Sequence, residues 1–116
     1  MTEDFWRDML VWALAINAVL GLAYRAYRLT KGGPMSDVIG QAILSCVLAL
    51  LAIGVATGSG AGRWGALAYG LLFAIVIMPA WVLAVLIPLR PRAVDYAFTT
   101  VYWIGCLVIV ASAIAL

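Results

Sequence analysis

The sequence predicts an all-α integral membrane protein with four transmembrane helices, and two observations lead to this fold class. The chain has 116 residues, 67% of them hydrophobic, and its mean hydropathy is +1.15. A water-soluble domain of this length has too little interior to bury so many apolar side chains. The apolar residues also lie in runs of about 20, the length that a helix needs to cross a hydrocarbon layer of about 30 Å.

The predicted helices are separated by short segments that hold most of the charge, glycine and proline. The apolar runs cover residues 9–24, 36–57, 65–87 and 96–116. They are continuously apolar instead of alternating, and four strands cannot close a barrel, so we exclude strands. Because the runs follow one another without a polar linker, residues 1–116 are expected to form a single domain.

The first run, residues 9–24, is expected to remain in the mature protein. Its leader MTEDFWRD carries three acidic residues against Arg7, whereas a secretory signal begins with a positive segment. Asn17 lies near the middle of this run, where an unpaired amide would cost free energy in hydrocarbon. We therefore expect Asn17 to hydrogen-bond to another helix, and a place along an ion or proton route is the alternative.

The second helix is expected to begin at Ser36 and Asp37, directly after the turn GGP. Both side chains can accept from free backbone N–H groups, and the Asp37 carboxylate complements the positive end of the helix dipole. One interpretation of Asp37 is therefore a cap that also pairs with a basic residue of the preceding turn. In the other, Asp37 and Gln41 bind a cation or relay a proton at the membrane boundary.

Small residues at every fourth position of the second and third helices predict close helix packing. They are Ala42, Cys46, Ala49, Ala52, Gly54, Ala56 and Gly58 in the second helix, and Ala66, Gly70 and Ala74 in the third. Cys46 and Cys106 each lie about ten residues into an apolar run. We expect both to be small packing residues and not a disulfide, a metal pair or a nucleophile.

Pro79 interrupts the third run and predicts a kink, because it removes one backbone donor and crowds the carbonyl of Ile75. A broken helix can also mark a binding site in transporters, which is the alternative to a passive kink. In the fourth helix, we expect Thr99, Thr100 and Ser112 to hydrogen-bond back to their own helix.

The distribution of charge predicts that both termini face the outside of a bacterial-type cell membrane, because short basic loops stay in the cytoplasm. The amino terminus and the second loop hold only Arg7 and Arg63. The first and third loops, each of which ends in an acidic residue (Asp37 and Asp95), are expected to hold the basic topology anchors. These anchors are Arg25, Arg28, Lys31, Arg90 and Arg92.

Several classes of protein are excluded by what the sequence lacks. The chain has no histidine, which removes bis-histidine haem, histidine–zinc sites and histidine general bases. The segment GSGAG lacks the Lys-Ser or Lys-Thr of a phosphate loop, and seven basic residues split between two faces do not form a nucleic-acid surface. We expect no enzymatic activity, cofactor or metal, and we expect the lipid bilayer and other membrane subunits or further copies as partners.

The segment YRAYRLTKGGPMSDVIGQAIL and the spans around it resemble the F subunit of Mrp-type cation/proton antiporters over about residues 10–88. That family is a small three-helix protein with an outward amino terminus and a Gly-Pro turn followed closely by Asp, positions that Gly33, Pro34 and Asp37 match. The chain differs in having Val38 where the family usually has Arg, in lacking acidic residues inside the second and third spans, and in adding a fourth helix. The resemblance implies an accessory subunit of a large antiporter assembly, with Asp37 near its ion path.

Three functional hypotheses follow from these observations. The first is a small non-catalytic subunit that packs into a larger membrane complex, and a complex that transports cations or protons is one candidate. The second is a phage-type holin or another self-assembling pore, which fits the short length, the several spans and the few charges. The third is a small oligomeric transporter, although four-helix drug/proton exchangers carry a Glu in their first span, where this chain has only Asn17.

Overall fold

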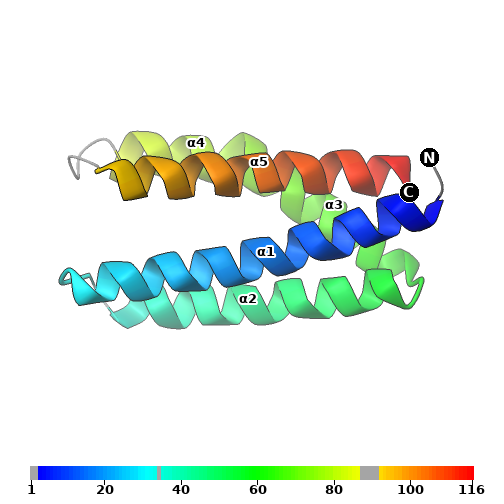
Figure 1. Ribbon diagram of the computed structural model, residues 1–116, viewed down its shortest axis with the longest axis horizontal. Helices are drawn as coiled ribbons and strands as arrows, with labels where there is room; N and C mark the ends of the chain where they lie inside the picture. The colour runs from blue at the N-terminus through cyan, green and yellow to red at the C-terminus, as the bar shows by residue number, and fades with distance from the viewer. Residues whose placement is uncertain (1–2, 34, 87–91) are drawn as a thin grey trace.

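The computed structural model describes residues 3–33, 35–86 and 92–116, and it arranges them as a bundle whose longest dimension is 43 Å (Figure 1). Every regular element in these ranges is helical. Their order is α1 (Glu3–Thr30), α2 (Met35–Ala56), α3 (Gly60–Leu72), η1 (Phe73–Ile77), α4 (Met78–Trp81), η2 (Val82–Leu86) and α5 (Ala93–Ala115).

The prediction of four helices that are long and apolar enough to cross a membrane is confirmed. By length and composition they are Asp4–Thr30, Met35–Ala56, Gly60–Ala84 and Ala93–Ala115. The elements α3, η1, α4 and η2 therefore form one continuous third span. Successive spans run in opposite directions, so Glu3 and Ala115 lie at the same end of the bundle (Figure 1).

We call this end the terminal end; it also holds the turn between α2 and α3. The opposite end, which holds the turn between α1 and α2 and the beginning of α5, is called the loop end (Figure 1). Of the predicted topology anchors, Arg25, Arg28, Lys31 and Arg92 lie at the loop end. Arg90 lies outside the described residues.

The first loop is shorter than predicted, because α1 continues to Thr30. The expectation that Arg25 and Arg28 lie in a loop is therefore wrong: both are in the last two turns of the helix. The residues between Tyr24 and Thr30 include no glycine or proline to end the helix, and Ala, Leu and Arg favour it.

Both α1 and α2 end at a glycine with positive φ, 90° at Gly32 and 83° at Gly58. The N–H of Gly33 donates to Arg28 O at 2.8 Å, and that of Ser59 donates to Gly54 O at 2.8 Å. These bonds, six residues to one, are those of the Schellman motif, which closes the last turn of a helix with a left-handed residue. The glycines predicted as turn signals thus act as helix stops.

The outside of the bundle carries many large apolar side chains. Leu14 and Ile109 are completely buried in the core, but Trp12 is 68% exposed and Val19 is 70% exposed. Large exposed apolar side chains occur on every span. Such a surface is unfavourable in water and favourable against hydrocarbon.

Close packing by small residues is confirmed where two spans meet through glycine. A Cβ added to Gly62 would lie 2.7 Å from Gly54 C, and one added to Gly70 would lie 2.7 Å from Val110 Cγ2. Backbones approach at these points because no side chain separates them. In α2, however, Cys46 and Ala49 are exposed, so they do not pack within this chain.

The two cysteines therefore differ, and the expectation that both are packing residues is wrong for one of them. Cys106 is buried in the core, whereas Cys46 is exposed on the outer surface of α2, and both are free thiols. Helix rotation explains the difference, because α2 turns its Cys46 face away from α1 and α3.

The helix register changes directly before Pro79. The N–H of Met78 donates to Phe73 O, five residues back, which makes η1 a π-helical turn. In that register the donor for Ala74 O would be residue 79, which as proline has no N–H. Trp103 Nε1 donates to Ala74 O instead, at 3.0 Å.

Candidate functional site

Polar side chains gather at two depths in the bundle, one group near its middle and one at the loop end. The middle group, called the central cluster, consists of Asn17 on α1, Tyr69 on α3, and Tyr102 and Cys106 on α5. Three spans therefore meet at one set of hydrogen bonds.

Asn17 is the residue that joins these spans. Its Nδ2 lies 3.4 Å from Tyr69 Oη, 3.5 Å from the Tyr102 carbonyl oxygen and 3.5 Å from Cys106 Sγ. The two tyrosine hydroxyls are 2.6 Å apart and share a hydrogen bond. The predicted interhelical hydrogen bond of Asn17 is thus confirmed, and its partners are on the third and fourth spans.

Gly105 gives the Asn17 side chain its space. A Cβ on Gly105 would overlap Asn17 Oδ1, so any other residue at position 105 would displace the amide. Asn17 Oδ1 is buried and has no hydrogen-bond partner among the described residues. It rests against the Gly105 backbone, where Cα–H groups form weak contacts with oxygen at helix–helix interfaces.

The central cluster contains an amide, two phenols and a thiol, and no carboxylate or amine. All four side chains are buried, and Asn17 and Cys106 are 0% exposed. Neutral hydrogen bonds of this kind hold helices together in an apolar surrounding without the cost of burying a charge.

At the loop end, Asp95 forms a second cluster, called the loop-end cluster, with Tyr24 and Arg28. Tyr24 Oη donates to Asp95 Oδ1 at 2.5 Å, and Arg28 Nη1 lies 3.6 Å from the same oxygen. The N–H of Arg92 donates to the other oxygen, Asp95 Oδ2, at 2.9 Å. Asp95 is in the first turn of α5, so its carboxylate also complements the helix dipole.

An aromatic group covers the loop-end cluster on its inner side. The rings of Tyr24 and Phe98 stack with centroids 3.9 Å apart, and Trp81 meets each of them edge-on at 6.1 Å. The Arg25 guanidinium lies 6.0 Å from the centre of the Trp81 ring. These contacts connect the end of the third span to α1 and α5.

Asp37 is placed differently from Asp95. Its Oδ2 lies 3.8 Å from Arg25 Nη1, which confirms the predicted ion pair, and its side chain is 46% exposed. α2 begins at Met35, one residue before the predicted start, so Ser36 and Asp37 both lie in its first turn. There the charge of Asp37 suits the helix dipole.

Gln41 is turned toward α1. Its side chain covers Gly21, where a Cβ would overlap it, and its Nε2 donates to Ser45 Oγ at 3.3 Å. Ser45 Oγ in turn donates to Ala18 O at 2.8 Å. Asp37 and Gln41 do line a common polar hollow of about 250 Å³ together with Arg25, whereas Asn17 belongs to the central cluster.

The predicted hydrogen bonds of three hydroxyl side chains to their own helix, α5, have three different outcomes. Thr99 Oγ1 donates to Asp95 O at 2.8 Å, so its predicted bond to its own helix is confirmed. Ser112 Oγ is buried and without a partner among the described residues, so that prediction is wrong for Ser112. For Thr100, which is exposed, the bond remains a prediction.

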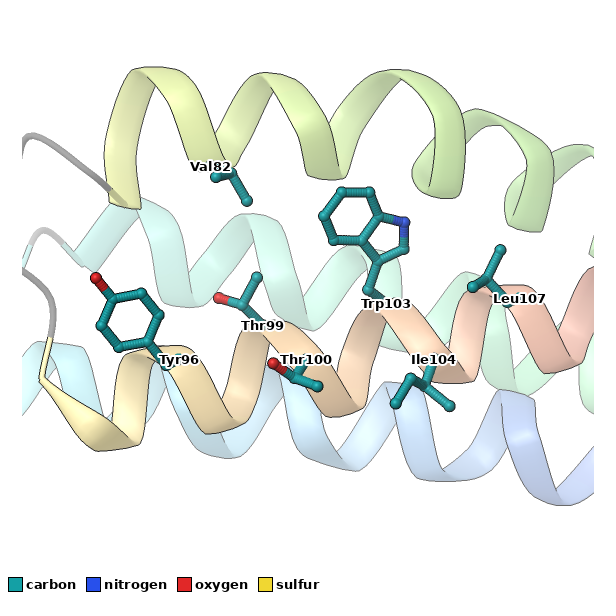
Figure 2. Close-up of a pocket in the computed structure, with 7 residues that line it drawn as sticks. All are labelled: Val82, Tyr96, Thr99, Thr100, Trp103, Ile104 and Leu107. Carbon is teal, nitrogen blue, oxygen red and sulfur yellow. The ribbon is translucent and has the colours of Figure 1, made fainter.

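A groove of about 430 Å³ runs between α5 and the third span, and its lining is almost entirely apolar (Figure 2). Figure 2 shows the Trp103 ring projecting from α5 toward the third span, with Val82 and Thr99 nearer the loop end. The indole N–H bond to Ala74 O ties the two spans together at this groove. The groove presents an apolar surface and few groups that could recognise a polar ligand.

Sequence reasoning missed the loop-end cluster and the tyrosines of the central cluster. One feature of the sequence could have indicated a role for Asp95: it is an acidic residue at the start of a span, directly after a basic loop. Tyr69 and Tyr102 gave no signal that separates them from the other tyrosines. Among the described residues, no group of three or more acidic or cysteine side chains could hold a metal ion.

The chain was also compared with known proteins. No protein family, curated protein or solved structure matches it.

Proposed function

We propose that the chain is a small, non-catalytic subunit of a larger membrane complex, and that it spans a bacterial-type cell membrane four times with both termini outside. The observation that carries this proposal is the combination of an apolar exterior with buried polar side chains that, apart from Ser112, hydrogen-bond inside the bundle. Lipid and the apolar surfaces of other subunits are the surroundings that suit such a molecule.

The buried polar groups support a structural role. Asn17, Gln41, Asp95 and Thr99 are buried, and each bonds to a neighbouring side chain or backbone group. A route for ions requires polar groups that face a shared water-filled space. Here they face contacts within or between helices, so any transport would depend on a partner.

The proposed orientation rests on charge at the two ends of the bundle. The described part of the loop end carries four basic residues, Arg25, Arg28, Lys31 and Arg92, and two acidic ones, Asp37 and Asp95. The excess of basic residues favours the cytoplasmic side. The aromatic residues Tyr24, Tyr27 and Trp81 at the same end suit a membrane interface.

Within this proposal, the partner complex is of a cation/proton transport type, and Asp37 is the residue presented to it. Two observations support this role for Asp37: its side chain is exposed, and the one ion pair that it forms among the described residues, with Arg25, is long, which leaves carboxylate oxygen available to a neighbour. Asp95, by contrast, has three partners and little exposed surface.

Gentle detergent extraction of the tagged full chain from its native membrane tests the subunit role. We expect other membrane proteins to copurify in fixed proportion. Recovery of the chain alone, or only as a homo-oligomer, would contradict the proposal, and abrupt depolarisation of cells that express it would instead favour the holin alternative.

The transport type is tested separately with Asp37→Asn, and Asp4→Asn serves as the matched control. Asp4 is also an exposed carboxylate with an arginine partner, Arg7, but it lies at the terminal end. We expect Asp37→Asn to lower cation-coupled proton transport in native membrane vesicles and Asp4→Asn to leave it unchanged. Equal activity of both variants would remove the transport type and keep the subunit role.

A further inference from the structure

A second groove runs along the seam between α1 and α5, which lie side by side at the front of the bundle (Figure 1). Its half near the loop end, of about 390 Å³, includes Ala23, Tyr27, Val94 and Ala97. Its other half, of about 410 Å³, reaches Val108, and both halves share Val101. We call the two halves together the α1–α5 groove.

The α1–α5 groove has the dimensions of a lipid chain. From Val94 to Val108 it follows α5 for about 21 Å at about 1.5 Å per residue. One leaflet of the hydrocarbon layer is about 15 Å deep. Its accessible lining is almost entirely carbon, because Asn17 at its base is already bound within the central cluster. An acyl chain fits this lining better than a polar ligand does.

The mouth of this groove at the loop end is basic. Lys31 Nζ lies 5.8 Å from the centre of the Tyr27 ring, and Tyr27 lines the groove. On the opposite wall, the exposed Arg92 immediately precedes α5. Among the described residues, neither Lys31 nor Arg92 forms an ion pair.

The carboxylates nearest to this mouth are already engaged. Asp95 is buried against Tyr24 and Arg28, and Asp37 is on α2 with Arg25. Two basic residues without an ion pair among the described residues therefore lie near the loop end of the groove: Lys31 contacts its lining residue Tyr27, and Arg92 is two residues before its lining residue Val94.

We propose that the α1–α5 groove binds an anionic phospholipid, with its phosphate at Lys31 and Arg92 and one acyl chain along the groove. A positive mouth complements a phosphate headgroup at the cytoplasmic interface. An uncharged transmembrane helix in the groove would form no favourable electrostatic contact with Lys31 and Arg92, whereas an anionic lipid would. We therefore assign the groove to a lipid. The proposal requires that the chain spans a membrane, but it does not depend on a partner complex.

The test uses the purified full chain in detergent and measures lipid binding by native mass spectrometry. Phosphatidylglycerol is compared with phosphatidylcholine of the same acyl chains. We expect the anionic lipid to bind more tightly, and we expect Lys31→Gln and Arg92→Gln each to weaken it roughly fivefold. Because the choline cation of phosphatidylcholine offsets the charge of its phosphate, we expect either substitution to weaken binding of phosphatidylcholine less than binding of phosphatidylglycerol.

The groove itself is tested by filling it. Ala97→Phe places a ring in the groove, and Ala49→Phe is the matched control, since Ala49 is an exposed alanine of α2 outside the groove. We expect Ala97→Phe to reduce binding of both lipids and Ala49→Phe to reduce neither. Ala23→Phe, on the opposite wall, gives the same test if Ala97→Phe does not fold.

Equal affinity for the two lipids in the unmodified chain would overturn the proposal. So would unchanged phosphatidylglycerol binding in the folded Ala97→Phe and Ala23→Phe variants. If these variants instead dissociated a dimer and left lipid binding intact, the occupant of the groove would be a second copy of the chain.

Discussion

The central cluster and the loop-end cluster both remove polar groups from hydrocarbon, but they do so with different chemistry. The central cluster uses neutral groups only, and Asn17, Tyr69 and Tyr102 share their hydrogen bonds across three spans. The loop-end cluster uses an ion pair, Asp95 with Arg28, near the end of the helices. Charge is thus kept at the boundary, where its desolvation costs less, and the middle is joined without it.

The comparison also separates the two carboxylates of the loop end. The Asp95 side chain is 9% exposed and that of Asp37 is 46% exposed, although both begin a helix and both face an arginine of α1. Burial and number of partners, more than sequence context, therefore decide which carboxylate stabilises the fold.

The largest expected effect is that of Asp95→Ala. Removing this carboxylate leaves Arg28 and the Tyr24 hydroxyl without their partner in a partly buried site, and we expect a loss of about 3 kcal/mol in the free energy of unfolding. For Asp37→Ala we expect at most about 1 kcal/mol, because its ion pair is exposed. Unfolding in mixed detergent micelles measures both; equal losses would contradict the difference between the two sites.

The next effect concerns two glycines. Gly105→Val would drive Asn17 out of the central cluster, at a cost of about 2–3 kcal/mol from overpacking and lost hydrogen bonds. A Cβ on Gly40 has no atom within 4 Å, so Gly40→Val should leave stability nearly unchanged in the same unfolding assay. Tolerance of both substitutions would show that Asn17 is not held as described.

A smaller effect separates the two tyrosines of the central cluster. Tyr69 Oη contacts Asn17 Nδ2 and Tyr102 Oη, whereas Tyr102 Oη contacts only Tyr69 among the described residues. We expect Tyr69→Phe to cost about 1–2 kcal/mol and Tyr102→Phe to cost less. A double-mutant cycle in mixed micelles measures their coupling, and additive losses would mean that the hydroxyls do not interact.

The smallest effect is that of Trp103→Phe. The substitution keeps a ring in the groove of Figure 2 but removes the N–H that donates to Ala74 O. We expect a loss of about 1 kcal/mol, because the carbonyl then lacks a donor. In a Pro79→Ala background, the added N–H can restore an α-helical register and give the Ala74 carbonyl a backbone donor. Trp103→Phe should therefore cost less stability in that background. An equal cost in both backgrounds would mean that the Trp103 hydrogen bond does not compensate for the proline.

Some of these features can be predicted from the sequence, and others depend on how the helices pack. The four spans follow from apolar runs alone, and Asn17 was predicted to need a partner because a lone amide in hydrocarbon must find one. The identity of that partner depends on which helices pack together and how each is rotated. A single sequence does not contain that arrangement, and for this reason Tyr69 and the exposed face around Cys46 were not foreseen.

Pro79 gives a second example of the same limit. An α-helical register names Ile75 as the orphan carbonyl, but the π-helical turn moves the vacancy to Ala74. Trp103 on another span supplies a donor at that position, and this contact is not visible in the local sequence. Local rules therefore locate the disturbed turn of the helix, but the carbonyl that loses its donor depends on the helix register.

Cys46 offers the most direct test of the central claim, that this apolar exterior is immersed in a membrane. Cys46 is exposed on the bundle and lies about 16 Å along α2 from Met35. In intact membranes we predict no reaction of Cys46 with a water-soluble maleimide until detergent unfolds the chain, whereas Gly32→Cys at the loop-end turn should react in opened vesicles. Rapid labelling of Cys46 in intact membranes would contradict the account.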